Sequence, residues 1–97
     1  WPSAWPSASI PPAALPDWCS TAYTMSQKAI CGDAGLSERE LRLTEHFGKL
    51  YGEYKGDKKQ ELWVAQEKWV ISREGCNGDV SCLLASYEAR IAELMSY

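Results

Sequence analysis

Apolar residues recur every three or four positions through most of the chain after residue 17, which is the period of a helix with one buried face. The sharpest stripe comprises Val80, Leu83, Leu84, Tyr87, Ile91, Leu94 and Met95. An earlier stripe comprises Leu43, Phe47, Leu50, Tyr51 and Tyr54. No window alternates between apolar and polar residues as a half-buried strand would. The pattern therefore predicts an all-α fold.

Capping signals divide this pattern into about four helices. Two segments match the capping box, in which a Ser or Thr is followed three residues later by Glu or Gln. They are Thr24 with Gln27, and Ser37 with Glu40. We expect a short helix over 25–31 and a longer one from 37 to about 55. Asp57 and Asp79 are good N-caps for helices that end near 74 and 95. Short connections favour antiparallel neighbours, so the prediction is a small antiparallel bundle.

The third expected helix is apolar on two sides. One stripe comprises Leu62, Ala65, Gln66, Trp69 and Arg73. Val64 and Ile71 lie on nearly the opposite face. A helix of this kind is usually covered by more than one element. The N-terminal arm and a second copy of the chain are the two interpretations of that cover, and the second implies a homodimer.

Residues 1–16 differ in composition from the rest of the chain. They contain all five prolines and the repeated tetrapeptide Trp-Pro-Ser-Ala. Proline removes backbone donors and favours extended chain in the residue before it. We expect an extended arm over 1–16 and a helical domain over 17–97. Trp1 and Trp5 are candidate binding residues, although packing of their rings against the domain is the simpler interpretation.

Composition and charge narrow the function. The 97 residues are 45% hydrophobic and 24% charged, as expected for one globular domain. The net charge of −3 gives no electrostatic reason to bind nucleic acid, which requires clustered Lys and Arg. A charge-steered partner would be basic. No apolar run approaches the roughly 20 residues of a transmembrane helix.

The four cysteines predict disulfides, because small exported domains use covalent links where the core is thin. Pairing Cys19 with Cys31 and Cys76 with Cys82 is the economical connectivity, although four cysteines allow three. A zinc site is disfavoured, since close CxxC spacing is missing and there is one histidine. We expect no metal and no cofactor. A first residue of Trp1 fits a removed signal peptide and equally a trimmed chain.

Two charged residues project from apolar stripes. Glu40 does so on the second expected helix and Arg73 on the third. An unpaired buried charge costs several kcal/mol, so we hypothesise that the two pair between helices. Gln66 or Tyr51 would complete their hydrogen bonds. An ion pair that sets packing specificity is the simpler role, and an Arg73 that faces a ligand is the alternative.

One string of residues carries a family resemblance. It runs Gln66-x-x-Trp69-x-x-x-Arg73-x-x-Cys76, then Cys82-Leu83, Tyr87, Arg90-Ile91 and Leu94, with Asp17-x-Cys19 and Ala29-Ile30-Cys31 upstream. Over residues 16–94 the chain resembles the LprI-like lysozyme-inhibitor family of exported bacterial proteins. A further match comprises Leu36, Glu40, Leu43 and Phe47, where the family more often has Asp in place of Glu40 and Tyr in place of Phe47. The resemblance implies a helical, disulfide-bonded domain of the periplasm or cell surface, sometimes lipid-anchored, with lysozyme inhibition as the named activity.

We therefore expect a periplasmic or secreted binding protein of the bacterial envelope. Its first candidate partner is a basic hydrolase of the lysozyme type, because complementary charge speeds association. The arm and two turns are candidate segments for insertion into the target's cleft. The turns contain Lys55 with Lys58, and Asn77 with Asp79. The alternative is an envelope adaptor or immunity-type module that can self-associate. We expect no catalysis, because the single histidine, His46, has no Ser or Cys nucleophile near it in the pattern.

Overall fold

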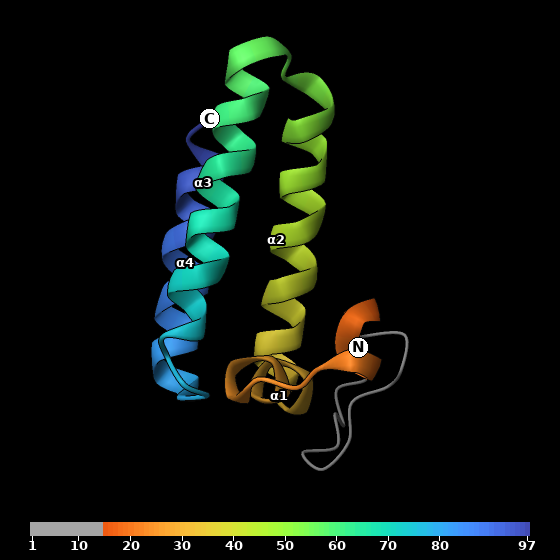
Figure 1. Ribbon diagram of the computed structural model, residues 1–97, viewed down its shortest axis with the longest axis vertical. Coiled ribbons are helices and arrows are strands. Elements are labelled where there is room, and N and C mark those ends of the chain that lie inside the picture. Colours follow the sequence, from red (N-terminus) through yellow and green to blue (C-terminus); the bar gives the residue numbers. More distant parts are fainter. Residues whose placement is uncertain (1–14) are drawn as a thin grey trace.

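The described part of the chain, residues 15–97 of a computed structural model, is entirely helical where it is regular. A 3-10 helix η2 (Asp17–Thr21) and a short helix α1 (Met25–Gly32) precede three long helices. The long helices are α2 (Ala34–Glu53), α3 (Gly56–Glu74) and α4 (Val80–Met95). Figure 1 shows the long helices side by side, with α1 lying across one end of them. The predicted all-α bundle is confirmed.

Two helix starts follow the local signals in the sequence. The Gln27 backbone N–H donates to Thr24 Oγ1 at 3.0 Å, and the Thr24 N–H donates to Gln27 Oε1 at 3.1 Å, which completes the predicted capping box of α1. At the start of α4, the Cys82 N–H donates to Asp79 Oδ1 at 2.8 Å. Each cap satisfies backbone donors that a helix leaves unpaired in its first turn.

The predicted start of α2 was wrong. The helix begins at Ala34 because Asp33 caps it, with Asp33 Oδ1 accepting from the Leu36 N–H at 3.0 Å. Ser37 lies inside the helix, where its hydroxyl donates to the Ile30 carbonyl at 2.6 Å and is buried. Asp33 and Ser37 are both good capping residues, and the contact with α1 decides between them.

The predicted cap of α3 was also wrong. The helix begins at Gly56, and Asp57 lies in its first turn rather than before it. Gly56 has a φ of 61°, in the left-handed region that glycine adopts most readily. That residue lets the chain reverse between α2 and α3. Asp57 remains favourable there, because a negative charge complements the positive end of the helix dipole.

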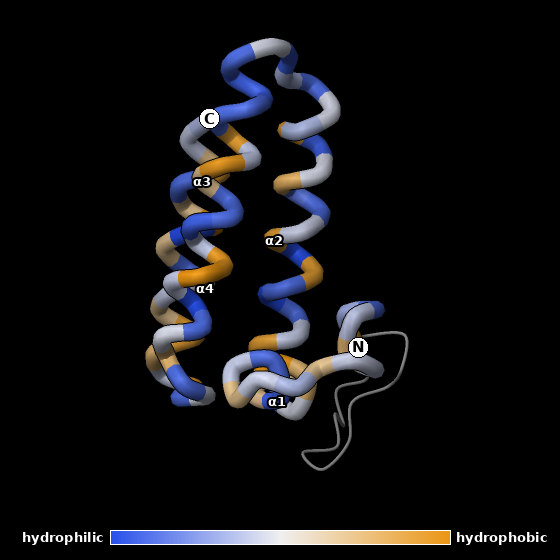
Figure 2. Tube along the Cα trace, viewed as in Figure 1, coloured by the Kyte–Doolittle hydropathy of each residue, from blue (hydrophilic) through white to orange (hydrophobic). Residues whose placement is uncertain are grey.

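The core lies between the three long helices and α1. Its buried apolar residues are Ile30, Leu36, Leu43, Leu62, Leu83, Tyr87, Ile91 and Leu94. Figure 2 shows apolar positions alternating with hydrophilic ones along each long helix, as the sequence pattern predicts. The α4 stripe is buried or half-buried from Leu83 to Leu94, whereas Val80 and Met95 at its two ends are 40% and 69% exposed. No helix in residues 15–97 is long and apolar enough to span a bilayer.

Both predicted disulfides are confirmed. Cys19–Cys31 joins η2 to the end of α1, and Cys76–Cys82 joins the α3–α4 turn to the first turn of α4. Both therefore lie at the end of the bundle where α1 packs. The opposite end, where α2 turns into α3, has no disulfide.

Candidate functional site

The expected ion pair between α2 and α3 is present and buried. Arg73 Nη1 lies 3.2 Å from Glu40 Oε1, and their side chains are 7% and 11% exposed. Tyr87 from α4 joins them, because its hydroxyl donates to Glu40 Oε1 at 2.8 Å and accepts from Arg73 Nη1 at 3.1 Å. These three side chains form a polar cluster that connects all three long helices.

Two further side chains complete the bonds of Glu40. Its Oε2 accepts from Trp18 Nε1 at 3.4 Å and from Thr44 Oγ1 at 3.0 Å. The Arg73 guanidinium also lies 5.8 Å from the ring centroid of Trp18 and 5.4 Å from that of Trp69, within cation–π range. The polar cluster therefore also anchors η2 through Trp18, and the next residue of η2, Cys19, is disulfide-bonded.

The predicted helpers of this pair were wrong. Gln66 Oε1 instead accepts from Arg90 Nε at 2.9 Å. Tyr51 stacks on Phe47, with ring centroids 5.6 Å apart. It lies about three turns beyond Glu40 along α2. The buried guanidinium of Arg73 is surrounded by protein groups, so the interpretation in which it faces a ligand has no accessible surface to support it. The cluster is structural.

Burial and the negative charge of Glu40 together raise the pKa of the Tyr87 hydroxyl well above its usual value of 10.0. A raised folded-state pKa means that the stabilisation is present below the unfolded-state pKa and is lost as the pH rises above it. We expect the free energy of unfolding to fall above about pH 10, by up to about 1.4 kcal/mol per pH unit from this group.

The measurement is urea unfolding of the wild-type chain and Tyr87→Phe at several pH values. The stability difference between the two should be constant up to about pH 9.5 and shrink above it, because the variant lacks the titrating group. A difference that does not change between about pH 9 and pH 11 would contradict the expectation.

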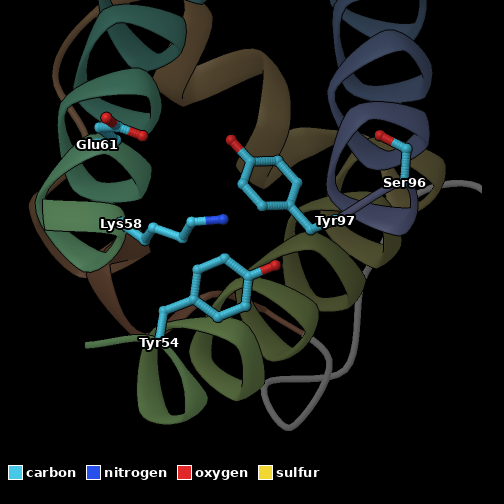
Figure 3. A pocket seen from close by; sticks show the side chains of 5 residues that line it. All are labelled: Tyr54, Lys58, Glu61, Ser96 and Tyr97. Atoms are coloured by element: carbon cyan, nitrogen blue, oxygen red, sulfur yellow. The ribbon is translucent and has the colours of Figure 1, made fainter. Parts of the chain in front are cut away.

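The candidate binding site lies at the other end of the bundle and is called the lysine tip here. It consists of the α2–α3 turn with Lys55, Lys58 and Lys59, together with Tyr54 and Tyr97. The two tyrosine rings lie 5.9 Å apart between centroids, at an interplanar angle of 48°. An open hollow of about 400 Å³ lies among Tyr54, Lys58, Glu61, Ser96 and Tyr97. Figure 3 shows the Lys58 side chain extending toward the two rings.

The three lysines of the lysine tip make no ion pair within 4.0 Å in the part of the chain that the structure describes, although Glu61 lines the same hollow as Lys58. Ten Lys and Arg side chains lie in residues 15–97, and five of them make ion pairs within 4.0 Å. The five without one are Lys28, Lys55, Lys58, Lys59 and Lys68. Three of these five are in the lysine tip. Lys59 lies 4.4 Å from the centroid of the Tyr51 ring, whereas Lys55 and Lys58 are exposed.

The second candidate turn has a role in the fold. The Gly78 N–H donates to Ser26 Oγ at 3.2 Å, and a Cβ at Gly78 would lie 3.1 Å from the Met25 carbonyl oxygen. Asp79 is engaged as the cap of α4, and Asn77 is exposed with a left-handed φ of 52°. This turn therefore packs on α1, in contrast to the lysine tip.

The structure does not bring the candidate residues into one site. The turn with Asn77 and Asp79 and the lysine tip lie at opposite ends of α3, whose 19 residues span about 28 Å. Trp1 and Trp5 lie outside the described residues. Tyr54 was placed on an apolar stripe from the sequence and was not among the candidate binding residues. Tyr97 follows the last apolar stripe, so no periodic signal marks it. Residues 15–97 bring no three His, Cys, Asp or Glu side chains together as metal ligands.

Comparison of the chain with protein-family models, with curated proteins and with solved structures found no match. The resemblance to the LprI-like family stays a prediction carried by the residues themselves.

Proposed function

We propose that this chain is an exported, non-catalytic binding protein that inhibits a cell-wall hydrolase of the lysozyme type. The observation that carries the proposal is the lysine tip, where Lys58 lines a hollow with the rings of Tyr54 and Tyr97. Lys58 and its neighbours Lys55 and Lys59 make no ion pair within 4.0 Å in the described residues. The two disulfides support a periplasmic or secreted location, since disulfides persist in oxidising compartments.

The chemistry of the proposed target suits this tip. A glycosidase cleft carries two carboxyl groups that flank the bond to be cleaved. A lysine ammonium that enters the cleft can pair with such a carboxylate. Tyrosine rings supply rigid contact area at a small cost in side-chain entropy, which favours them in binding surfaces. A tip held by the helical bundle also loses little conformational freedom on binding.

The test is lysozyme turnover in the presence of excess protein, with lysozymes of several classes. We expect the wild-type chain to inhibit at least one class. Lys58→Glu should weaken that inhibition at least about tenfold, because it replaces the positive charge that faces the target's carboxylates by a negative one. Lys28→Glu is the matched control, since Lys28 is also exposed and without an ion pair but lies on α1 at the other end.

Two results would contradict the proposal. One is unchanged turnover for every lysozyme class tested with the wild-type chain. The other is an equal loss of inhibition in Lys28→Glu and Lys58→Glu, which would show that net charge rather than the tip is responsible.

The second candidate function is an envelope adaptor or immunity-type module. The observation that favours it is the exposure of apolar side chains on α3, where Val64 and Ile71 on the side away from the core are 38% and 72% exposed. Exposed apolar groups of this kind are typical of protein-binding surfaces when they cluster. Capture of an envelope protein that is lost in Ile71→Lys but kept in Lys58→Glu would favour this function over inhibition through the tip.

A further inference from the structure

The side of α3 that faces away from the core carries a short apolar ridge. Val64 and Ile71 are exposed and lie seven residues apart, so they line up along the helix within about 20°. Leu62 and Arg73 on the opposite side of the helix are buried. We call the surface formed by Val64, Glu67, Lys68 and Ile71 the outer α3 face.

A hollow lies on each flank of this ridge. One, of about 300 Å³, is lined by Gln60, Glu61, Val64, Ala65 and Lys68. The other, of about 260 Å³, is lined by Trp63, Gln66, Glu67, Val70 and Ile71. A ridge with a groove on each side can pack against a copy of itself, because the ridge of one helix fits into a groove of the other. The outer α3 face therefore has the shape that a symmetric helix pair requires.

The charges on this face distinguish between the two symmetric arrangements. Glu67 and Lys68 are adjacent in sequence, so they flank the ridge on opposite sides, about 100° apart. Neither makes an ion pair within residues 15–97. In a parallel pair, the two-fold axis runs parallel to α3. The Glu67 side of one copy then faces the Lys68 side of the other, so each Glu67 lies against Lys68 of the second copy. In an antiparallel pair, the two-fold axis runs perpendicular to α3. The same side of each copy then meets, so Glu67 lies against Glu67 and Lys68 against Lys68.

We propose that the outer α3 face binds the same face of a second copy in a parallel, in-register homodimer. Val64 and Ile71 each meet their own equivalent at the two-fold axis, and two Glu67–Lys68 pairs flank them. The ridge is only about 10 Å long, whereas a stable interface buries about 800 Å² per partner. The dimer is therefore weak and forms with increasing concentration. It places both lysine tips at the same end, and it does not depend on what those tips bind.

The first test is sedimentation equilibrium of the full chain from micromolar to millimolar concentration. We expect the mass to double with concentration for the wild-type chain and to remain that of a monomer for Ile71→Lys. Met95→Lys is the matched control, because Met95 is similarly exposed at 69% but lies on α4. A single exposed substitution of this kind changes stability by only about 0.5 kcal/mol, so folding is preserved.

The second test is a charge exchange. Glu67→Lys or Lys68→Glu alone should weaken the dimer about tenfold or more, because each sets like charges against one another twice. The double variant E67K/K68E should restore wild-type dimerisation. In an antiparallel dimer, Glu67→Lys would only turn a Glu–Glu contact into a Lys–Lys contact, and Lys68→Glu would do the reverse. The double variant would then show no recovery of dimerisation relative to the single variants.

Three outcomes would overturn the proposal. The first is a full chain that stays monomeric at every concentration. The second is a dimer equally sensitive to Met95→Lys and Ile71→Lys. The third is a chain lacking residues 1–14 that dimerises at concentrations where the full chain stays monomeric, which would show that the arm covers the outer α3 face instead.

Discussion

Replacing Arg73 by Met is expected to lower the free energy of unfolding by about 3–5 kcal/mol. The Arg73 guanidinium is the only cationic group among the described contacts of the Glu40 carboxylate. Without it, a buried negative charge remains with three neutral donors. The loss is a large share of the 5–15 kcal/mol that stabilises a typical domain. Urea unfolding at neutral pH, followed by circular dichroism, measures it.

Arg42→Met provides the matched control on the same helix as Glu40. Arg42 Nη2 lies 2.6 Å from Glu38 Oε1, a shorter distance than in the buried pair, but the side chains are 52% and 43% exposed. Exposed pairs contribute at most about 1 kcal/mol, since water screens both charges. Equal losses in Arg42→Met and Arg73→Met would contradict the assignment of the polar cluster as the main polar link between the helices.

A second variant separates the lost pair from the stranded charge. In E40L/R73M both charged groups are replaced by apolar ones of similar size. Replacement of a whole buried ion pair is often neutral or stabilising. We therefore expect this double variant to be more stable than Arg73→Met, although the Tyr87 hydroxyl loses its carboxylate partner. A double variant less stable than Arg73→Met would show that the pair itself, rather than the unpaired Glu40, determines the loss.

The features that could be predicted from the sequence are those set by residues near one another in the chain. The Thr24–Gln27 capping box and the Asp79 cap each depend on residues within one helical turn. The disulfides span separations of 12 and 6 residues, and each joins a helix end to its neighbouring turn. The apolar period fixed the fold class, because three helices with one apolar side each must bury those sides together.

The features that could not be predicted depend on contacts between distant segments. Periodicity placed Glu40 and Arg73 on core-facing stripes, which was enough to expect a pair. It contained nothing to show that Trp18 and Tyr87, which are 22 and 47 residues from Glu40, would complete the hydrogen bonds. The start of α2 at Asp33 rather than Ser37 also depends on a distant contact, since the Ser37 hydroxyl is taken by the Ile30 carbonyl of α1.

The candidate binding residues, too, could be predicted only in part from the sequence. Lys55 and Lys58 could be chosen from the sequence because a turn rich in lysine lies between two apolar stripes. Their lack of acidic partners required the three-dimensional structure, because Asp57 and Glu61 are close in sequence yet lie beyond 4.0 Å. The two-sided pattern of α3 was visible from Val64 and Ile71. Only the exposure of these two side chains in the structure shows that this side of α3 faces away from the core.

Removing both disulfides, with Ser at all four cysteine positions, is expected to lower the free energy of unfolding by about 5 kcal/mol. The closed loops of 12 and 6 residues contribute about 3 and about 2 kcal/mol, because each link restricts the unfolded chain. Such a loss equals the whole stability of a marginal small domain, so the four-serine chain should be largely unfolded at physiological temperature. Circular dichroism and urea unfolding of this variant check the expectation.

The two double variants show whether loop entropy alone accounts for that loss. C76S/C82S should lose only the entropic contribution of about 2 kcal/mol, because the Asp79 cap and the Gly78–Ser26 hydrogen bond still hold the α3–α4 turn. C19S/C31S should lose more than its own loop predicts. It frees η2 and with it the Trp18 indole, which donates to Glu40 and lies against Arg73. Part of the added loss should therefore disappear in the E40L/R73M background, where Trp18 has no charged partners to hold. Equal losses of C19S/C31S in both backgrounds would show that this disulfide acts on the unfolded chain alone.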